Sequence, residues 1–411
     1  MNLRKTGSAG QTEKSALVGA AFLTGASSIG PGFLVQTSLF TAQFGASMGA
    51  VVLCTILLDI AVKSNVWRVI GAAGIRGQDI ANRLLPGLGH AVAVLVALGG
   101  LLFSVGNVGG AALGLNALAG LPLWAGYLVS SLLAILIFLS KNARAGIDAA
   151  SKILSILVLA VLLVVAFLAK PPMGRVAEKL FLPDRTAELL FPMITLLGGA
   201  SGGYISYSGA HRLLDSGFSG QENLGRIQKS VLLAAAITGV SRILIFLVAL
   251  GVCSGGGAAA AAAIAGAENP AGEAFRRAAG EFGYRLFGVA LFSAGITTII
   301  GSSYTSVSFL KTLHPVIEKQ EKWFISGFIA LSAAMMALLG NASSLLVAAG
   351  SVNGLILPVT MGVIFAASHS RRIVGRTYRH PPALTAAGIL VLLLTGYAGI
   401  RALPGLAAIF T

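Results

Sequence analysis

The chain is built from long apolar stretches separated by short polar segments. A helix needs about 20 apolar residues to cross about 30 Å of hydrocarbon. Eleven stretches fit this requirement, at residues 16–43, 46–66, 90–118, 121–139, 150–169, 189–213, 229–253, 286–311, 323–340, 344–367 and 384–402. They are continuous rather than alternating, which argues against a β-barrel. The pattern predicts an all-α polytopic membrane protein with about 11 transmembrane helices.

Composition agrees with this prediction. Charged residues make up 10% of the 411 residues, and hydrophobic residues make up 56%. Ordinary soluble domains carry about 25% charged residues. These values exclude a soluble enzyme, a coiled coil and a disordered chain. Cys54 and Cys253 both lie in apolar stretches, so we interpret them as packing residues rather than as a disulfide or metal framework.

The charge distribution predicts an orientation. The net charge of +15 does not indicate a nucleic-acid partner, because no face combines basic and aromatic residues. With a cytoplasmic N-terminus, 20 Lys and Arg residues fall in inside loops, 8 fall outside, and Arg242 remains inside a span. Lys63 belongs to the inside group in this count. The positive-inside rule therefore places the N-terminus in the cytoplasm and the C-terminus outside a bacterial-type inner membrane.

Two stretches interrupt otherwise apolar spans. One is Gly25–Gly32, which contains Pro31, in the middle of the first span; the other is Gly198–Gly203 in the sixth. Glycine in a span commonly serves close helix packing. Two matched interruptions five helices apart instead indicate an inverted-repeat transporter with a binding site at broken helices.

This interpretation divides the chain into segments. We expect a cytoplasmic tail at residues 1–15 and a first repeat of helices 1–5 at 16–169. An extracellular loop follows at 170–188. The second repeat of helices 6–10 covers 189–367 and includes an extracellular loop at 254–285. Helix 11 and the C-terminus occupy 368–411.

Three segments resemble the NRAMP family of metal-ion transporters, which have a LeuT-type fold. The run GPGFLVQTSLFTAQFG, from Gly30 to Gly45, is similar to the family's helix 1 from its Asp-Pro-Gly-Asn motif onward. The run LNALAGLPLWAG, from Leu115 to Gly126, resembles the junction of helices 3 and 4. Gly199-Ala-Ser201 resembles the start of the broken helix 6. The resemblance implies a LeuT-type 5+5 inverted repeat and a transport function.

The departures from the family pattern concern its metal site. The family's metal-binding Asp falls on Gly30 and its Asn on Phe33. Its helix 6 Met-Pro-His falls on Gly203-Tyr204-Ile205, and the acidic pair tied to proton movement falls on Ser104 and Asn107. We therefore carry over the fold and the transport role but no metal ligands.

The groups that remain at the breaks fit a small organic anion or zwitterion. Half-helices beginning at a break present free N–H groups and a positive dipole end. The predicted substrate-binding residues are Ser27, Ser28, Gly30, Gly32, Phe33, Gln36, Ala200, Ser201, Gly202, Gly203, Tyr204 and Tyr207. An amino acid, a 5-oxoproline-like compound or a short organic acid would suit them. The alternative is a divalent metal cation transporter with a remodelled site, for which Asp59 is the only carboxylate well inside a span.

Candidate coupling or gating residues lie around these breaks. They are Ser104, Asn107, His211, Arg212, Asp215, Arg242, Thr297 and Thr298. His211 and Asp215 would share a helix face as a cytoplasmic gate, or form the solvated end of a helix. Arg242 could pair with Asp59 or Asp215, or extend toward the cytoplasmic surface. The helix 8 hydroxyls favour sodium as coupling ion, while proton coupling and uniport remain open.

Other functional classes have less support in the sequence. No phosphate-binding loop appears, so transport would use gradients rather than ATP. No nucleophile–base pair indicates an enzyme, and no cofactor is expected beyond a coupling sodium ion or proton. A non-transporting receptor or assembly factor is a further alternative. The expected partners are a small-molecule substrate and the lipid bilayer. The oligomeric state is left open, with a monomer as one option.

Overall fold

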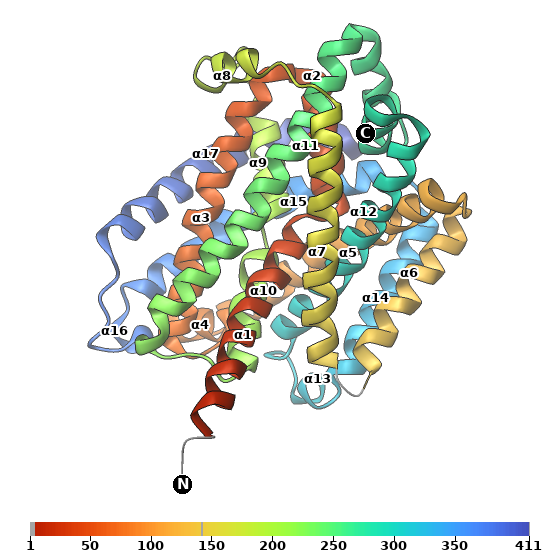
Figure 1. The fold of residues 1–411 in the computed structure, drawn as a ribbon. Coiled ribbons are helices and arrows are strands. Elements are labelled where there is room, and N and C mark those ends of the chain that lie inside the picture. Colours follow the sequence, from red (N-terminus) through yellow and green to blue (C-terminus); the bar gives the residue numbers. More distant parts are fainter. Residues whose placement is uncertain (1–4, 141–142, 411) are drawn as a thin grey trace.

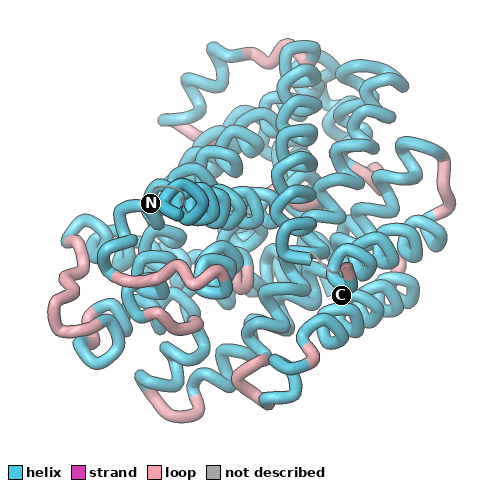
Figure 2. The backbone as a smooth tube through the Cα atoms, turned by 60° about the horizontal axis from the view of Figure 1, so that its bottom comes forward, coloured by secondary structure: helices cyan, strands magenta, loops and turns pink. Residues whose placement is uncertain are grey.

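The computed structural model describes residues 5–140 and 143–410, which fold into helices joined by short connections (Figure 2). No strand occurs among these described residues. In Figure 1, helix α1 begins at the lower end of the bundle, where α13 and α16 also lie, and α8 lies at the opposite end. We refer to the end at which α1 begins as the N-terminal end.

Helices are present in each of the eleven apolar stretches. The first five stretches contain α1 (Lys5–Ser28) with α2 (Pro31–Phe44), then α3 (Met48–Ala73), α5 (Leu88–Ala119), α6 (Leu123–Leu139) and α7 (Ala143–Leu168). The other six contain α9 (Leu190–Ser201) with α10 (Ile205–Asp215), then α11 (Leu224–Gly266), α12 (Pro270–Leu310), α14 (Glu321–Leu339), α15 (Ala342–Ser368) and α17 (Pro382–Phe410). Short helices between them are α4 (Gly77–Leu84), α8 (Met173–Phe181), α13 (Pro315–Lys319) and α16 (Arg371–Val374).

The all-helical membrane architecture is confirmed, but the number of crossings is not. Seven helices of the described part are long and apolar enough to span a membrane, or eight if the pair 152–168 and 173–181, bent by 108°, counts as one. The remaining stretches contain shorter or interrupted helices, such as Leu123–Leu139. Eleven crossings therefore stay a prediction.

The connections are more helical than the sequence suggested. The segment 254–285 was expected to be a loop, yet α11 continues to Gly266 and α12 begins at Pro270. Non-helical angles at Gly257 and Gly280 bend these two helices. The alanine-rich composition explains the helix, because alanine has the highest helix propensity. Helix α8 likewise occupies part of 170–188. Of the tail 1–15, residues 1–4 lie outside the described part, and α1 starts at Lys5.

Both predicted interruptions are present. Helix α1 ends at Ser28, and α2 begins at Pro31 after Gly30, which has extended backbone angles (φ −66°, ψ 171°). Proline fits the first turn of a helix because its missing N–H would have no partner there. Helix α9 ends at Ser201, and α10 begins at Ile205. Gly203 lies between them with φ +50°, a conformation that favours glycine.

Helices α5 and α12 pack backbone to backbone. A methyl group at Gly288 would lie 2.7 Å from the carbonyl oxygen of Gly114, and one at Gly295 would lie 2.6 Å from the Cβ of Ala111. These glycines leave no room for side chains, so the helix axes approach closely. We call this contact the α5–α12 seam. It runs beside the α1–α2 break, since Pro31 lies against Gly110 of α5.

Candidate substrate site at the helix breaks

A buried charged pair lies one turn apart on α3. The Nζ atom of Lys63 lies 2.8 Å from Oδ1 and 2.9 Å from Oδ2 of Asp59. The side chains are 0% and 1% exposed, respectively. Burying two charges is costly unless they are paired and hydrogen-bonded. The fork between the ammonium group and both carboxylate oxygens satisfies that requirement.

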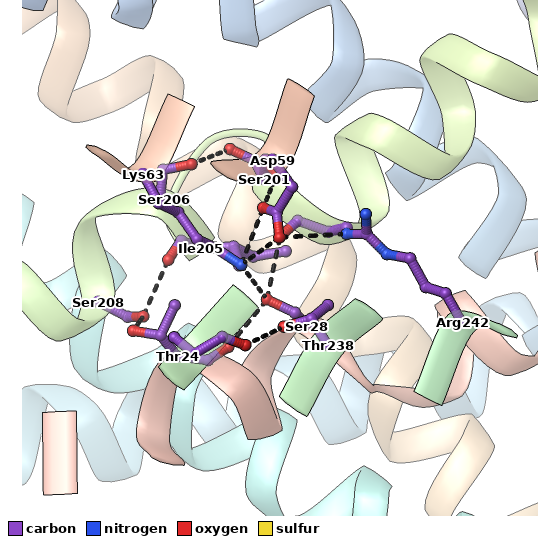
Figure 3. Close-up of polar contacts among 12 residues, drawn as sticks. Thr24, Ser28, Asp59, Lys63, Ser201, Ile205, Ser206, Ser208, Thr238 and Arg242 are labelled. Carbon is purple, nitrogen blue, oxygen red and sulfur yellow. Dashed lines mark hydrogen bonds and ion pairs between the residues drawn. The ribbon is translucent and has the colours of Figure 1, made fainter. Parts of the chain in front are cut away.

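Each member of this pair also contacts one of the two breaks (Figure 3). Lys63 Nζ donates to Ser28 Oγ at 3.1 Å, at the last residue of α1. The hydroxyl of Ser201, the last residue of α9, donates to Asp59 Oδ1. Ser28 in turn lies 3.0 Å from the carbonyl oxygen of Ala200, and its Oγ donates to it. One turn of α3 therefore links the ends of both broken helices.

Arg242 of α11 completes the cluster as a second cation. Its Nη2 atom lies 3.7 Å from Asp59 Oδ2, and its side chain is 1% exposed. The guanidinium carbon lies 5.8 Å from the centroid of the Phe33 ring, just past the first break. Nε, Nη1 and Nη2 of Arg242 have no hydrogen-bond partner. The predicted pairing with Asp59 is present as an ion pair, whereas Asp215 is engaged elsewhere. We call Asp59, Lys63 and Arg242 the charged triad.

Lys63 was assigned to a loop in the sequence analysis, and that assignment is wrong. The residue lies inside α3 and is fully buried. The sequence signal that could have revealed it is its spacing of four from Asp59, which places the two charges on one helix face. Without Lys63, 19 Lys and Arg residues remain in the inside group against 8 outside, so the excess of positive charge on the predicted cytoplasmic side is not reversed.

Gln36 lies where α2, α9 and α15 meet. Its Nε2 donates to the carbonyl oxygen of Leu346 at 2.7 Å, and its Oε1 is buried without a partner. A methyl group at Gly199 would lie 2.7 Å from that Oε1. Gly350 also closely approaches the amide. Gly199 of α9 and Gly350 of α15 thus leave space for the side chain of Gln36.

Several buried polar groups near the second break are poorly satisfied. The hydroxyl of Ser104 has no hydrogen bond, and the Tyr204 hydroxyl and the Asn107 amide have no partner other than each other. Tyr204 packs edge-on against Phe103 with ring centroids 5.9 Å apart. Gly32 faces the same Phe103, whose Cε1 atom would lie 3.2 Å from a methyl group there. Unpartnered buried polar groups are uncommon in proteins, which makes this region a candidate ligand contact.

Asn353 of α15 is a residue that the sequence analysis missed. Its Nδ2 donates to the carbonyl oxygens of Gly99 and Ala349, both at 2.9 Å, while Oδ1 has no partner. Methyl groups at Gly202 and Gly203 would overlap Asn353. The tenth apolar stretch offered no break or charge to single it out.

The predicted sodium-site hydroxyls of α12 bond within their own helix. Thr298 Oγ1 donates to the carbonyl oxygen of Ala294 at 2.7 Å, and Thr297 Oγ1 lies 3.0 Å from the same carbonyl. The Thr298 methyl carbon would lie 2.6 Å from a Cβ at Gly30. Ser27 bonds to Leu23 and packs near Gly301 of α12. Thr298 and Ser27 therefore flank the first break, but sodium binding remains a prediction.

The predicted gate residues gather at the N-terminal end. Arg76 Nη2 lies 2.7 Å from Asp215 Oδ1, and the Tyr304 hydroxyl donates to Asp215 Oδ2. His211 Nε2 accepts from the N–H of Gly77 at 3.2 Å. Arg212 bonds to Ser216 at 2.6 Å. The neighbouring residues Arg76 and Gly77 contact Asp215 and His211, respectively. His211 and Asp215 therefore lie on the same face of α10.

Tyr207 belongs to this end rather than to the charged triad. Its hydroxyl donates to the carbonyl oxygen of Thr360 at 3.1 Å. Its ring packs edge-on against Phe309 at 5.0 Å and lies 5.8 Å from the His211 ring. The predicted substrate lining is therefore split between two places.

A cavity of about 590 Å³ lies beside the C-terminal half of α2, away from the first break. Its lining includes Leu39, Glu268, Asn341, Ser344 and Val347. Val347 directly follows Leu346, whose carbonyl accepts from Gln36. Leu39 follows Gln36 by three residues, so the cavity lies about one turn of α2 from Gln36.

Solved structures share this arrangement of helices. A manganese transporter from Eremococcus coleocola superposes with a TM-score of 0.76 at 16% identity, covering 96% of this chain and 87% of the other. MhsT, solved in complex with L-phenylalanine, gives a TM-score of 0.63 at 14% identity, covering 94% and 98%. The fold with its two broken helices is that of a LeuT-like membrane transporter.

Sequence comparison gives the family. The model for natural resistance-associated macrophage protein-like (Nramp) proteins matches residues 21–403, and the chain belongs to this family. It is 45% identical over 389 residues to the membrane protein YcsG of Bacillus subtilis, covering 95% of this chain and 94% of the relative. A Haemophilus influenzae membrane protein is 41% identical, covering 93% and 94%. The family resemblance noted in the sequence is confirmed.

Proposed function

We propose that this protein is a secondary transporter that carries a small carboxylate-bearing solute, such as an amino acid, a 5-oxoproline-like compound or a short organic acid. The observation that carries the proposal is the composition of the charged triad. Lys63 and Arg242 face a single carboxylate, that of Asp59, beside both helix breaks. With all three groups ionised, one positive charge remains without a partner.

Arg242 supports the proposal most directly. A guanidinium group presents its donors in a planar fork that matches a carboxylate. All three guanidinium nitrogens of Arg242 are buried and lack hydrogen bonds. A solute carboxylate would satisfy these donors and balance the surplus charge. The buried Oε1 of Gln36, together with the Tyr204 hydroxyl and the Asn107 amide, is available for the rest of the solute.

The alternative is a divalent metal cation as substrate, as in the manganese transporter with the similar fold. Two cationic side chains beside the breaks oppose it, because they would repel such an ion. Gly30 and Phe33 also replace the family's ligands at the first break. Among the described residues, no three His, Cys, Asp or Glu side chains gather into a metal-binding group.

We further propose the setting in which the protein works. It lies in a bacterial-type inner membrane, with its N-terminus in the cytoplasm and its C-terminus outside. The 590 Å³ cavity would then open toward the exterior and lead to Gln36. Transport uses an ion gradient and alternating access about the two breaks.

A ligand screen on the purified protein tests the proposed substrate class. Thermal unfolding is followed with L-proline, 5-oxoproline and lactate, with their amides, and with Mn²⁺ and Mg²⁺. We expect at least one acid to raise the Tm and its amide to have no effect. Arg242→Gln should weaken that binding about 10- to 100-fold, since a hydrogen bond to a charged group contributes about 1.5–3 kcal/mol.

Arg371→Gln is the matched control, because Arg371 is exposed on α16. It should bind the acid as the parent does. Stabilisation by micromolar Mn²⁺ or Mg²⁺, with no response to any acid, would support the metal alternative. Uptake into proteoliposomes that stays flat for every solute would instead favour a receptor or assembly factor.

A further inference from the structure

The charged triad has unequal numbers of positive and negative groups, and all three side chains are buried. Lys63 and Arg242 are 0% and 1% exposed, and Asp59 is 1% exposed. When all three are ionised, the empty site has one net positive charge. An uncompensated charge within the membrane interior is expensive. The transporter must return empty across the membrane in every cycle. Removing the net charge of the empty site would therefore favour that step.

Only one member of the triad can remove the charge by changing its protonation. Arginine stays protonated in proteins. Protonation of Asp59 would raise the net charge of the triad to two. Loss of a proton from Lys63 brings the net charge to zero, because Arg242 and Asp59 then balance each other.

The contacts of Lys63 allow both protonation states. A neutral amine has two N–H groups, which suffice for Asp59 at 2.9 Å and Ser28 at 3.1 Å. An ammonium group has a third N–H, which can reach the second carboxylate oxygen at 2.8 Å. No neighbour has to move for the proton to arrive or leave.

The charged groups facing Lys63 come from two helices. Asp59 lies on α3 itself, and Arg242 comes from α11. Helix α1 contributes the hydroxyl of Ser28, and α9 contributes that of Ser201, which bonds to Asp59. Neither hydroxyl titrates near neutral pH. A solute carboxylate at Arg242 would be the only further charge in the cluster.

We propose that Lys63 is the residue that couples solute transport to protons. Its amine is neutral in the empty site and takes one proton from the aqueous phase on the entry side when the solute carboxylate binds. The loaded site then contains two positive and two negative charges. Release of the solute returns the proton to the water on the other side. The site stays neutral in both states, and one proton accompanies each carboxylate. This inference rests on the proposed function.

Uptake into proteoliposomes tests the coupling. The probe is 5-oxoproline, which has a carboxylate but no amine that titrates near neutral pH. With the outside more acidic by one pH unit, we expect the parent protein to accumulate the probe about tenfold. A potassium–valinomycin potential should have little effect, because the proposed step moves no net charge. Lys63→Met should abolish accumulation driven by the pH gradient, and any remaining uptake should respond to the potential.

Lys152→Met is the control, because Lys152 is an exposed lysine on α7. It should accumulate the probe like the parent. Accumulation by Lys63→Met that still follows the pH gradient would overturn the proposal. So would parent uptake that ignores the gradient.

A second measurement needs no solute and separates this proposal from the proposed function. If Lys63 is neutral in the empty protein, the unfolded chain binds one more proton. The stability of the parent should then rise from about pH 6 to about pH 9. Lys63→Met should show a smaller rise, whereas Lys152→Met should match the parent. Equal slopes for the parent and Lys63→Met would overturn the proposal, even if no acid in the screen binds.

Discussion

Asp59 and Lys63 lie one turn apart on α3 and are paired at 2.8 Å, yet they contact different helix breaks. Lys63 donates to Ser28 at the end of α1, and Asp59 accepts from Ser201 at the end of α9. Two segments that are far apart in the sequence are therefore held by a single helix turn. This relationship makes α3 the natural target for mutagenesis.

Asp59→Asn should be strongly destabilising. The substitution removes the carboxylate that faces Arg242 and Lys63, and leaving a buried charge without its partner costs about 3–5 kcal/mol. Thermal unfolding measures the loss. Adding Lys63→Met to Asp59→Asn should recover part of the stability, because the buried amine that has lost its carboxylate partner is then removed. Asp184→Asn, at an exposed carboxylate near α8, is the control. A double variant less stable than Asp59→Asn would contradict this account.

The two glycines of the breaks should respond differently to alanine. Gly203 has φ +50°, and a methyl group there would overlap Asn353 Oδ1. The left-handed conformation alone costs about 1–2 kcal/mol for a residue with a side chain. Gly32 would meet Phe103 and Leu346 only at 3.2 and 3.3 Å. We expect Gly203→Ala to lower the Tm clearly and Gly32→Ala to lower it little. Similar Tm losses in the two variants would argue against the described break at Gly203.

The fold was more predictable than the site, for a physical reason. Apolar stretches and Gly-rich breaks are properties of consecutive residues, so the helices and both interruptions could be read from the chain. The charged triad combines α3 with α11, and the contacts of Asn353 depend on how α15 packs. Lys63 was misassigned because a cation close to the predicted span end at residue 66 was counted with the loop, although α3 continues to Ala73. The one local signal was the spacing of four between Asp59 and Lys63, which places both charges on one helix face.

The ion pair at the N-terminal end should limit access from that side. Asp215 bonds to both Arg76 and Tyr304, which connects α10 with α12 and the α3–α4 turn. Asp215→Asn should loosen this closure. With Cys54 and Cys253 replaced by serine, a cysteine introduced at buried Ser208 should react faster with a water-soluble maleimide. We expect an increase of about tenfold, which corresponds to about 1.4 kcal/mol of lost closure.

A cysteine introduced at Thr37 is the matched control for this experiment. Thr37 is also buried but lies on α2, beyond the first break. Its labelling rate should not change in Asp215→Asn. An equal increase at both positions would indicate general loosening of the fold rather than an opening at one end.

His380 predicts a pH dependence of stability outside the spans. Burial, together with His369 and Arg68, lowers the pKa of His380 to about 4. Its Nε2 lies 2.9 Å from Asn65 Oδ1, and its Nδ1 lies 2.7 Å from the Tyr378 hydroxyl. An unfolded histidine has a pKa of about 6.5. Between these values the unfolded state binds more protons, so stability should fall as the pH drops from about 6.5 to about 4.

His380→Gln removes this titration and should reduce the acid-induced loss of Tm over that range. His314→Gln is the comparison, because His314 is exposed and accepts from the nearby N–H of Val316. It should behave like the parent. An unchanged acid response in His380→Gln would assign the effect to other groups.

The α5–α12 seam limits how the protein can change shape. Where peptide backbones touch, there are no side-chain layers to slide over one another or to change rotamers. The two helices should therefore move as a single rigid body, and exchange between inward- and outward-facing forms must be achieved by the interrupted helices that lie beside them.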